Sequence, residues 1–115
     1  MYHVIILPHF LRQLNTYVKK HRRLKDDVIV CLEQFDARLH AHLGNNVYKV
    51  RLKSRDIPRG KSKSFRLIVL LINAGSFLVP ISIYFKGDQE DIARKEINDH
   101  LETILFELRA RQFLM

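Results

Sequence analysis

The amino-acid sequence predicts a single α+β domain, and three observations support this class. The chain has 115 residues, a length that suits one domain over residues 1–115. Hydrophobic residues make up 47% of it, enough to bury a core and too many for a disordered chain. The hydrophobic period also changes along the chain, so helices and strands fall in separate segments. The expected element order is β-α-α-β-β-β-α.

The amino-terminal half contains a short strand and two helices. Residues 2–7 are rich in β-branched side chains and end at Pro8, which predicts a strand leading into a helix. Apolar residues at helical spacing over residues 9–23 predict the first helix. A second helix is expected over residues 25–42, with Gly44 as its stop signal. The two helices would form a hairpin.

The second half is expected to form three strands and a closing helix. Strict alternation over residues 48–53, followed by apolar runs at 64–72 and 77–86, predicts an antiparallel meander, because the connections are too short for crossovers. Pro80 suggests an edge position or a bulge in the last strand. A helix is expected over residues 88–109. With the first strand beside the meander, the prediction is an antiparallel four-stranded sheet with the helical hairpin packed on one face.

Positive charge is concentrated in the middle of the chain. The net charge is +8, and residues 47–66 hold eight Lys or Arg against one acid. An anionic partner such as a nucleic acid is therefore expected. The apolar runs are too short to span a membrane, and the one cysteine, Cys31, cannot form an internal disulfide. These features favour a cytoplasmic protein with no membrane partner.

Strand alternation gathers part of this charge on one face of the sheet. Odd-numbered apolar residues within 65–71 and 77–85 are expected to face the helices. Cations two residues apart on a strand are about 6.7 Å apart, close to the spacing of phosphates on one RNA strand. The alternative is an ordinary solvated sheet face. The predicted polar face consists of Lys49, Arg51, Lys53, Arg66, Ser82, Tyr84 and Lys86.

Three segments resemble the RelE/ParE toxin superfamily of bacterial and archaeal toxin–antitoxin systems. They are a lysine-rich strand at 47–53, a Gly-Lys-Ser loop entering an aromatic-Arg-hydrophobic strand at 59–68, and a strand ending in lysine before an acidic stretch at 83–92. The resemblance implies a toxin that enters the ribosomal A site and cuts mRNA. It also implies an acidic antitoxin as partner, in a toxin–antitoxin hetero-oligomer. The family loop often reads Gly-Lys-Ser-Gly-Gly, whereas this chain has Gly-Lys-Ser-Lys-Ser at 60–64.

Cleavage of this kind needs no metal or cofactor, because the ribose 2′-OH attacks the adjacent phosphate. The site then needs a proton acceptor, a charge clamp and a proton donor. Neighbouring cations favour a neutral lysine, so Lys53 or Lys49 is the expected base. Arg66 is the expected clamp, and Tyr84 or Lys86 the expected donor. The predicted RNA-binding residues are Lys49, Arg51, Lys53, Arg59, Lys61 and Lys63.

Two other functions are compatible with the same sequence. A non-catalytic ParE-like toxin that inhibits DNA gyrase, or a decayed toxin that only binds nucleic acid or antitoxin, would carry a similar sequence.

His40 and His42 lie two residues apart near the expected helix end, where their side chains diverge, so a metal site there is not expected. Cys31 has no activating neighbour and is expected to be a packed thiol.

Overall fold

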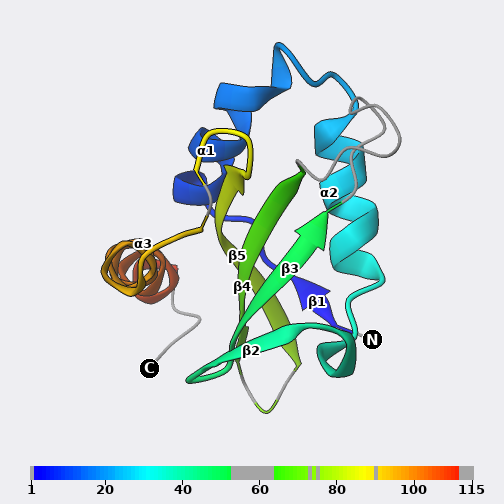
Figure 1. Ribbon diagram of the computed structural model, residues 1–115. Helices are drawn as coiled ribbons and strands as arrows, with labels where there is room; N and C mark the ends of the chain where they lie inside the picture. Colours follow the sequence, from blue (N-terminus) through cyan, green and yellow to red (C-terminus); the bar gives the residue numbers. More distant parts are fainter. Residues whose placement is uncertain (1, 53–63, 73, 75, 90, 112–115) are drawn as a thin grey trace.

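Five strands form one mixed sheet in the order β1-β5-β4-β3-β2, with helices on both faces (Figure 1). The computed structural model describes residues 2–52, 64–72, 74, 76–89 and 91–111. None of the helices within these residues is long and apolar enough to cross a membrane. The elements are β1 (His3–Val4), α1 (Pro8–Val18), α2 (Leu24–Glu33), the 3-10 helix η1 (Ala37–Leu39), β2 (Ala41–Gly44), β3 (Val47–Leu52), β4 (Phe65–Ile72), β5 (Phe77–Phe85) and α3 (Arg94–Ala110).

The α+β class is confirmed, and the sheet differs from the expected one at its two edges. β1 does lie beside the meander, but it runs parallel to β5, so the sheet is not wholly antiparallel. The amide of His3 donates to the carbonyl of Ser76 at 2.9 Å, and that of Ile5 to the carbonyl of Leu78 at 3.0 Å. Because β4 is antiparallel to both β3 and β5, β1 runs in the same direction as β3 and β5.

The second edge strand, β2, was not predicted, because its residues were assigned to a helix ending at 42. Helix α2 ends at Glu33 instead, and the Asp36 carboxylate accepts from the backbone amide of Arg38 at 3.0 Å to start a 3-10 turn. Gly44, Asn45 and Asn46 all have positive φ and form the turn between β2 and β3. Such a run of left-handed residues is typical of a hairpin turn, and here it is not a helix stop.

Strand β5 contains the bulge that Pro80 suggested. Ser82 pairs with Ile68 and Pro80 with Val69, so Ile81 has no partner on β4. The extra residue inverts the alternation, and Val79 and Ile81 face α3 instead of the helical hairpin. The prediction that they lie on the face opposite Tyr84 was therefore wrong.

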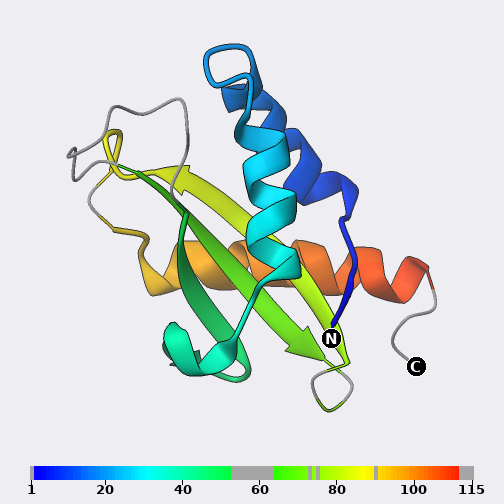
Figure 2. The same cartoon turned by 90° about the vertical axis from the view of Figure 1, so that its right-hand side faces the viewer.

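Each face of the sheet carries its own core. Figure 2 shows α1 and α2 on one side of the sheet and α3 on the other. The hairpin side buries Phe10, Leu14, Leu24, Val28, Leu32, Val50, Phe65, Leu67 and Leu78. The α3 side buries Val47, Ile68, Leu70, Val79, Ile81, Ile104 and Leu108. The face predicted to be polar thus carries a second core, in which Ile68, Leu70 and Ile81 pack with Ile104 and Leu108 of α3.

Helix α3 begins at Arg94, six residues later than expected, and Ala93 is its N-cap. The amides of Asp88 and Gln89 both donate to the carbonyl of Phe85, which makes a turn directly after β5. The Asp91 carboxylate accepts from the amide of Ile92 at 2.8 Å. These local bonds hold the segment before α3 in a non-helical path.

A histidine pair connects α3 to α1. Nε2 of His9 and Nδ1 of His100 are 2.8 Å apart. Burial, and then the charge of His100, lower the pKa of His9 below its ordinary value of 6.5, although Glu107 acts in the opposite direction. The pair is therefore stable with at least one ring neutral.

We expect acidification to weaken this connection. Because the folded-state pKa of His9 is lowered, the unfolded chain takes up the proton first as the pH falls through 6.5, and folding stability decreases. The melting temperature of the wild type should fall more between pH 8 and pH 5.5 than that of His9→Gln. A control variant, His42→Gln, changes an exposed histidine in β2 and should keep the wild-type difference. Equal pH dependence in all three proteins would contradict the assignment.

Candidate nucleic-acid interface

Two arginines and a tyrosine form a row across the three central strands. Arg51 of β3 pairs directly with Arg66 of β4, and Arg66 pairs with Tyr84 of β5. Directly opposite residues in antiparallel strands lie on the same face, with Cβ atoms about 4.5–5.5 Å apart. The row is on the α3 side of the sheet, because Tyr84 packs in the core beneath that helix. The strand registers thus bring together three of the predicted polar-face residues.

Like charges opposite each other destabilise a sheet unless an anion lies between them. Arg66 is half-buried, and burial followed by the charge of Arg51 lowers its pKa. Its Nη1 donates to the hydroxyl of Ser64 and, at 3.4 Å, to the carbonyl of Phe65. Among the described residues no carboxylate forms an ion pair with either arginine. Both guanidinium groups therefore have donors to offer an incoming anion.

One carboxylate oxygen connects this row to Lys49. Oδ1 of Asp91 accepts from Nζ of Lys49 at 3.1 Å, from the hydroxyl of Tyr84 at 3.2 Å and from the amide of Ile92 at 2.8 Å. The bond from Ile92 and then that from Lys49 lower the pKa of Asp91. An oxygen that accepts three donors in this way occupies a position suited to an anionic oxygen.

Tyr84 keeps its proton. Its side chain is 4% exposed, and burial, followed by the charge of Asp91, raises its pKa to about 12. The phenol is therefore a hydrogen-bond donor at neutral pH and is not a base. This excludes one of the two acid–base roles that a tyrosine can take at this position.

Of the remaining predicted residues, Ser82 and Lys86 are among those that the structure describes. Lys86 follows β5, is half-buried, and its amide donates to the carbonyl of Ser64 at 2.8 Å. Its side chain has no hydrogen-bond or ion-pair partner among the described residues. Ser82 donates from its hydroxyl to Gln13 of α1 at 3.0 Å, which makes it part of the packing against α1. The predicted residues Lys53, Arg59, Lys61 and Lys63 lie outside the described residues.

Asp91 was missed as a site residue by the sequence reasoning. It was assigned to the first turn of the closing helix, where acidic residues are common. Its contacts with β3 and β5 depend on the path of the chain between β5 and α3, which the local pattern does not reveal.

The histidines and the cysteine have structural surroundings. His40 stacks on Phe35 with ring centroids 5.2 Å apart, and His42 stacks on Tyr48 at 4.7 Å. Burial raises the pKa of Cys31 to about 11, as expected for a packed thiol. Within the ranges that the structure describes, no three His, Cys, Asp or Glu side chains gather as the ligands of a metal would.

Comparison with known proteins identifies the fold. No family model matches the sequence, and no curated protein does. Among solved structures, a mutant of the E. coli toxin RelE in the free state matches with a TM-score of 0.50 and 18% identity, over 77% of this chain and 87% of that one. The intact E. coli RelBE toxin–antitoxin complex contains a chain that matches with a TM-score of 0.48 and 18% identity, over 72% and 94%.

The domain therefore has the fold of a small toxin from a toxin–antitoxin system. The particular fold is that of RelE, as the sequence resemblance implied. At this level of identity the likeness concerns the fold, and the function has to be argued from the site.

Proposed function

We propose that the protein is the toxin of a toxin–antitoxin system and cleaves mRNA on the ribosome. The observation that carries the proposal is the direct pairing of Arg51 with Arg66 and of Arg66 with Tyr84. Two opposed guanidinium groups beside a protonated phenol suit a phosphate that gains negative charge during the reaction. The sequence resemblance to the RelE/ParE toxins, which implies mRNA cleavage, makes RNA the favoured substrate class.

The roles follow from the chemistry of each side chain. Arg66, with a planar fork in the middle strand, binds two oxygens of the pentavalent phosphate, and Arg51 supplies the adjacent charge. Tyr84 donates its proton to the departing 5′-oxygen, and its raised pKa keeps that proton in place until the bond breaks. The attacking 2′-OH loses its proton to Lys49 or Lys53. Lys86 remains the alternative donor.

For Lys49, the ion pair with Asp91 has to open before the lysine can act. The side chain of Asp91 is 62% exposed, so the pair is screened by water and is weak. An RNA phosphate that replaces the carboxylate would take over the donors from Lys49 and Tyr84. An ammonium that donates to phosphate is not a base, so Lys49 takes the 2′-OH proton only after its own ammonium group has released a proton to water. While it stays charged, Lys49 holds the phosphate and Lys53 takes the 2′-OH proton.

The proposed partners are an acidic antitoxin and the ribosome with its mRNA, in the cytoplasm. The net charge of +8 favours an acidic protein partner, and the E. coli RelBE structure contains such a toxin together with its antitoxin. A toxin–antitoxin hetero-oligomer is the assembly that this charge favours.

The ends of the cleaved RNA test the mechanism. Purified protein added to translating ribosomes should cut mRNA and leave a 2′,3′-cyclic or 3′-phosphate and a 5′-hydroxyl, because the 2′-OH is the nucleophile. Primer extension locates the cuts, and labelling by polynucleotide kinase without prior phosphatase treatment detects the 5′-hydroxyl. RNA with 5′-phosphate ends would contradict the mechanism. Intact mRNA together with loss of DNA gyrase supercoiling would favour the ParE-like alternative instead.

A further inference from the structure

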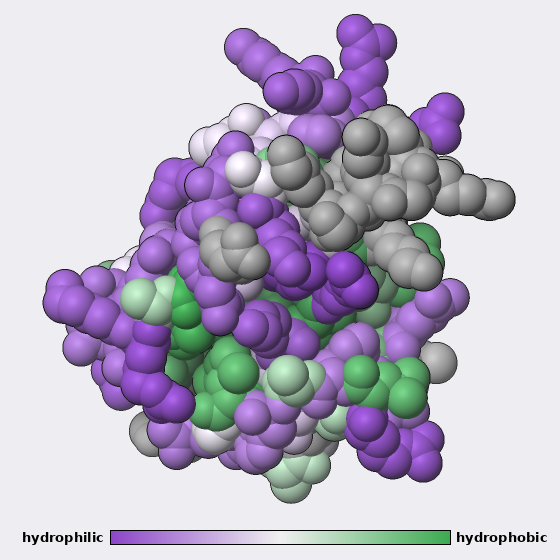
Figure 3. Space-filling view, viewed as in Figure 1, coloured by the Kyte–Doolittle hydropathy of each residue, from purple (hydrophilic) through white to green (hydrophobic). Residues whose placement is uncertain are grey.

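A groove of about 170 Å³ lies next to the arginine row, between the β2–β3 hairpin and the amino-terminal half of α3. In Figure 3, hydrophobic surface is exposed between α3 and this hairpin, in the same orientation as Figure 1. Most of its exposed lining is apolar, with polar side chains among the lining residues, and we call it the hairpin groove. It is lined by Leu43, Gly44, Asn45, Val47, Lys49, Asp91, Ile92, Arg94, Ile97, Asn98 and Leu101.

The size and walls of the hairpin groove suit a flat ring. An apolar cavity of about 150 Å³ holds benzene in a well-studied protein, so a volume of about 170 Å³ admits an aromatic ring. Leu43 of β2 faces Ile97 and Leu101 of α3 across the groove, and all three are half-buried. Aliphatic side chains on two sides can sandwich a planar base.

Three polar side chains that line the groove form no hydrogen bond or ion pair with other described residues. The side chains of Asn45, Arg94 and Asn98 line the groove, and each lacks a hydrogen-bond or ion-pair partner among the residues that the structure describes. An asparagine amide offers one donor and one acceptor side by side, which matches the edge of a nucleobase. All three residues are exposed, so their polar groups are hydrated in the free protein and accessible to a ligand that enters the groove.

The hairpin groove is continuous with the proposed cleavage site. Lys49 and Asp91 line the groove and also belong to the network that includes Tyr84. Lys49 and Arg51 are two residues apart on the same face of β3, a separation of about 6.7 Å. A nucleotide with its phosphate on the arginine row therefore places a neighbouring base at the groove.

We infer that the hairpin groove binds one nucleobase of the RNA strand and that Asn98 reads its edge. This inference rests on the proposed function, because it takes the arginine row as the phosphate site. It adds a determinant of base preference to the protein's own surface. The preference would act in addition to any selection that the ribosome imposes.

Mononucleotide binding tests the groove without any cleavage. The probes are the four 5′-ribonucleoside monophosphates, added to protein with labelled isoleucine and leucine methyl groups and followed by NMR. The methyl resonances of Leu43, Ile97 and Leu101 should shift with nucleotides and not with inorganic phosphate, and one base should bind more tightly than the others. In Asn98→Ala that preference should fall about tenfold, as expected for loss of a bidentate amide–base contact. The matched control is Asn15→Ala, an exposed asparagine on α1 that lies outside the groove.

Cleavage assays separate this inference from the proposed function. On RNAs that differ only in the base next to the cut, Asn98→Ala should reduce the ratio of rates between best and worst base, with little change for the worst. Nucleotide-induced shifts in a protein that never cuts RNA would remove the proposed nuclease and leave the groove assignment standing. Cleavage whose base preference survives Asn98→Ala, with groove methyls that ignore all four nucleotides, would overturn the inference. Methyl shifts caused only by an acidic protein partner would overturn it too, since the groove would then be a peptide site.

Discussion

Arg66→Ala is expected to lower the rate of RNA cleavage by about 100-fold to 1000-fold, which corresponds to roughly 3–4 kcal/mol of transition-state stabilisation. Arg66 lies in the middle strand, between Arg51 and Tyr84. Its contact with the phosphate strengthens as charge develops, so the loss should appear mainly in the rate and less in RNA affinity. Single-turnover cleavage at saturating protein measures this rate directly.

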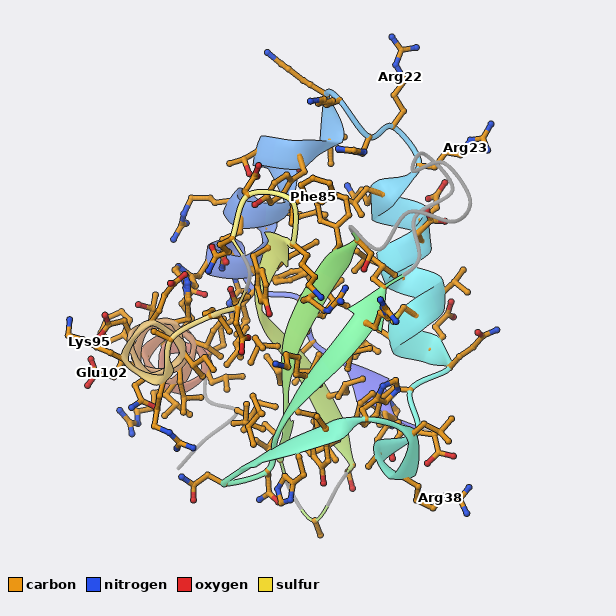
Figure 4. All side chains as sticks on the ribbon, in the orientation of Figure 1. Arg22, Arg23, Arg38, Phe85, Lys95 and Glu102 are labelled. Atoms are coloured by element: carbon orange, nitrogen blue, oxygen red, sulfur yellow. The ribbon has the colours of Figure 1, made fainter. Side chains whose placement is uncertain are left out.

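Two variants make the Arg66 experiment specific. Arg66→Lys keeps the charge and loses the planar fork, so it should recover little activity. Arg22→Ala removes an arginine that points away from the protein at the connection between α1 and α2 (Figure 4), and it should cleave at the parent rate. Thermal melting of all three variants should stay close to the wild type. A folded Arg66→Ala protein with parental activity would remove Arg66 from the site and, with it, the main support for a nuclease.

The arginine row could be predicted from sequence because it depends on two rules only. Alternation places Arg51 and Arg66 on one face of their strands, and the short connections force an antiparallel meander. The pairing of Arg51 with Arg66 is the particular register that the structure adds. Tyr84 lies on the predicted face because it follows the bulge. The bulge inverts the alternation only for the residues of β5 that precede Ser82.

Features set by tertiary contacts were not predictable in the same way. A four-residue strand such as β2 is too short for a periodic signal, and Gly44 ends a helix as readily as it opens a hairpin turn. The bulge at Ile81 inverted the faces of Val79 and Ile81, which no local pattern marks beyond Pro80 itself. Apolar residues on both faces of β4 did signal a second core, since Ile68 and Leu70 are as apolar as Leu67 and Val69.

Phe65→Ala is expected to lower the free energy of unfolding by about 3–5 kcal/mol, a large part of the roughly 5–15 kcal/mol of a typical domain. Phe65 precedes Arg66 in β4, has 0% exposure and points to the opposite face of the sheet. Its ring centroid lies 5.0 Å from those of Tyr17, His21 and Phe85, so truncation removes three ring contacts and leaves a cavity. Urea denaturation followed by circular dichroism measures the change.

Phe106→Ala is the matched control, because Phe106 on α3 is 70% exposed and its loss should change stability by no more than about 0.5 kcal/mol. Because Phe65 and Arg66 point to opposite faces of β4, substitutions at these two positions distinguish the role of one face from that of the other. Alanine at 65 should reduce cleavage only through the fraction of unfolded protein, and activity should return on cooling or with an osmolyte that favours the folded state. Alanine at 66 should leave a stable protein whose lost activity no stabilising condition restores. The opposite result, stability lost at 66 and activity lost at 65 in a protein that remains folded, would mean that the arginine row is a packing feature of the sheet and that the phosphate site lies elsewhere.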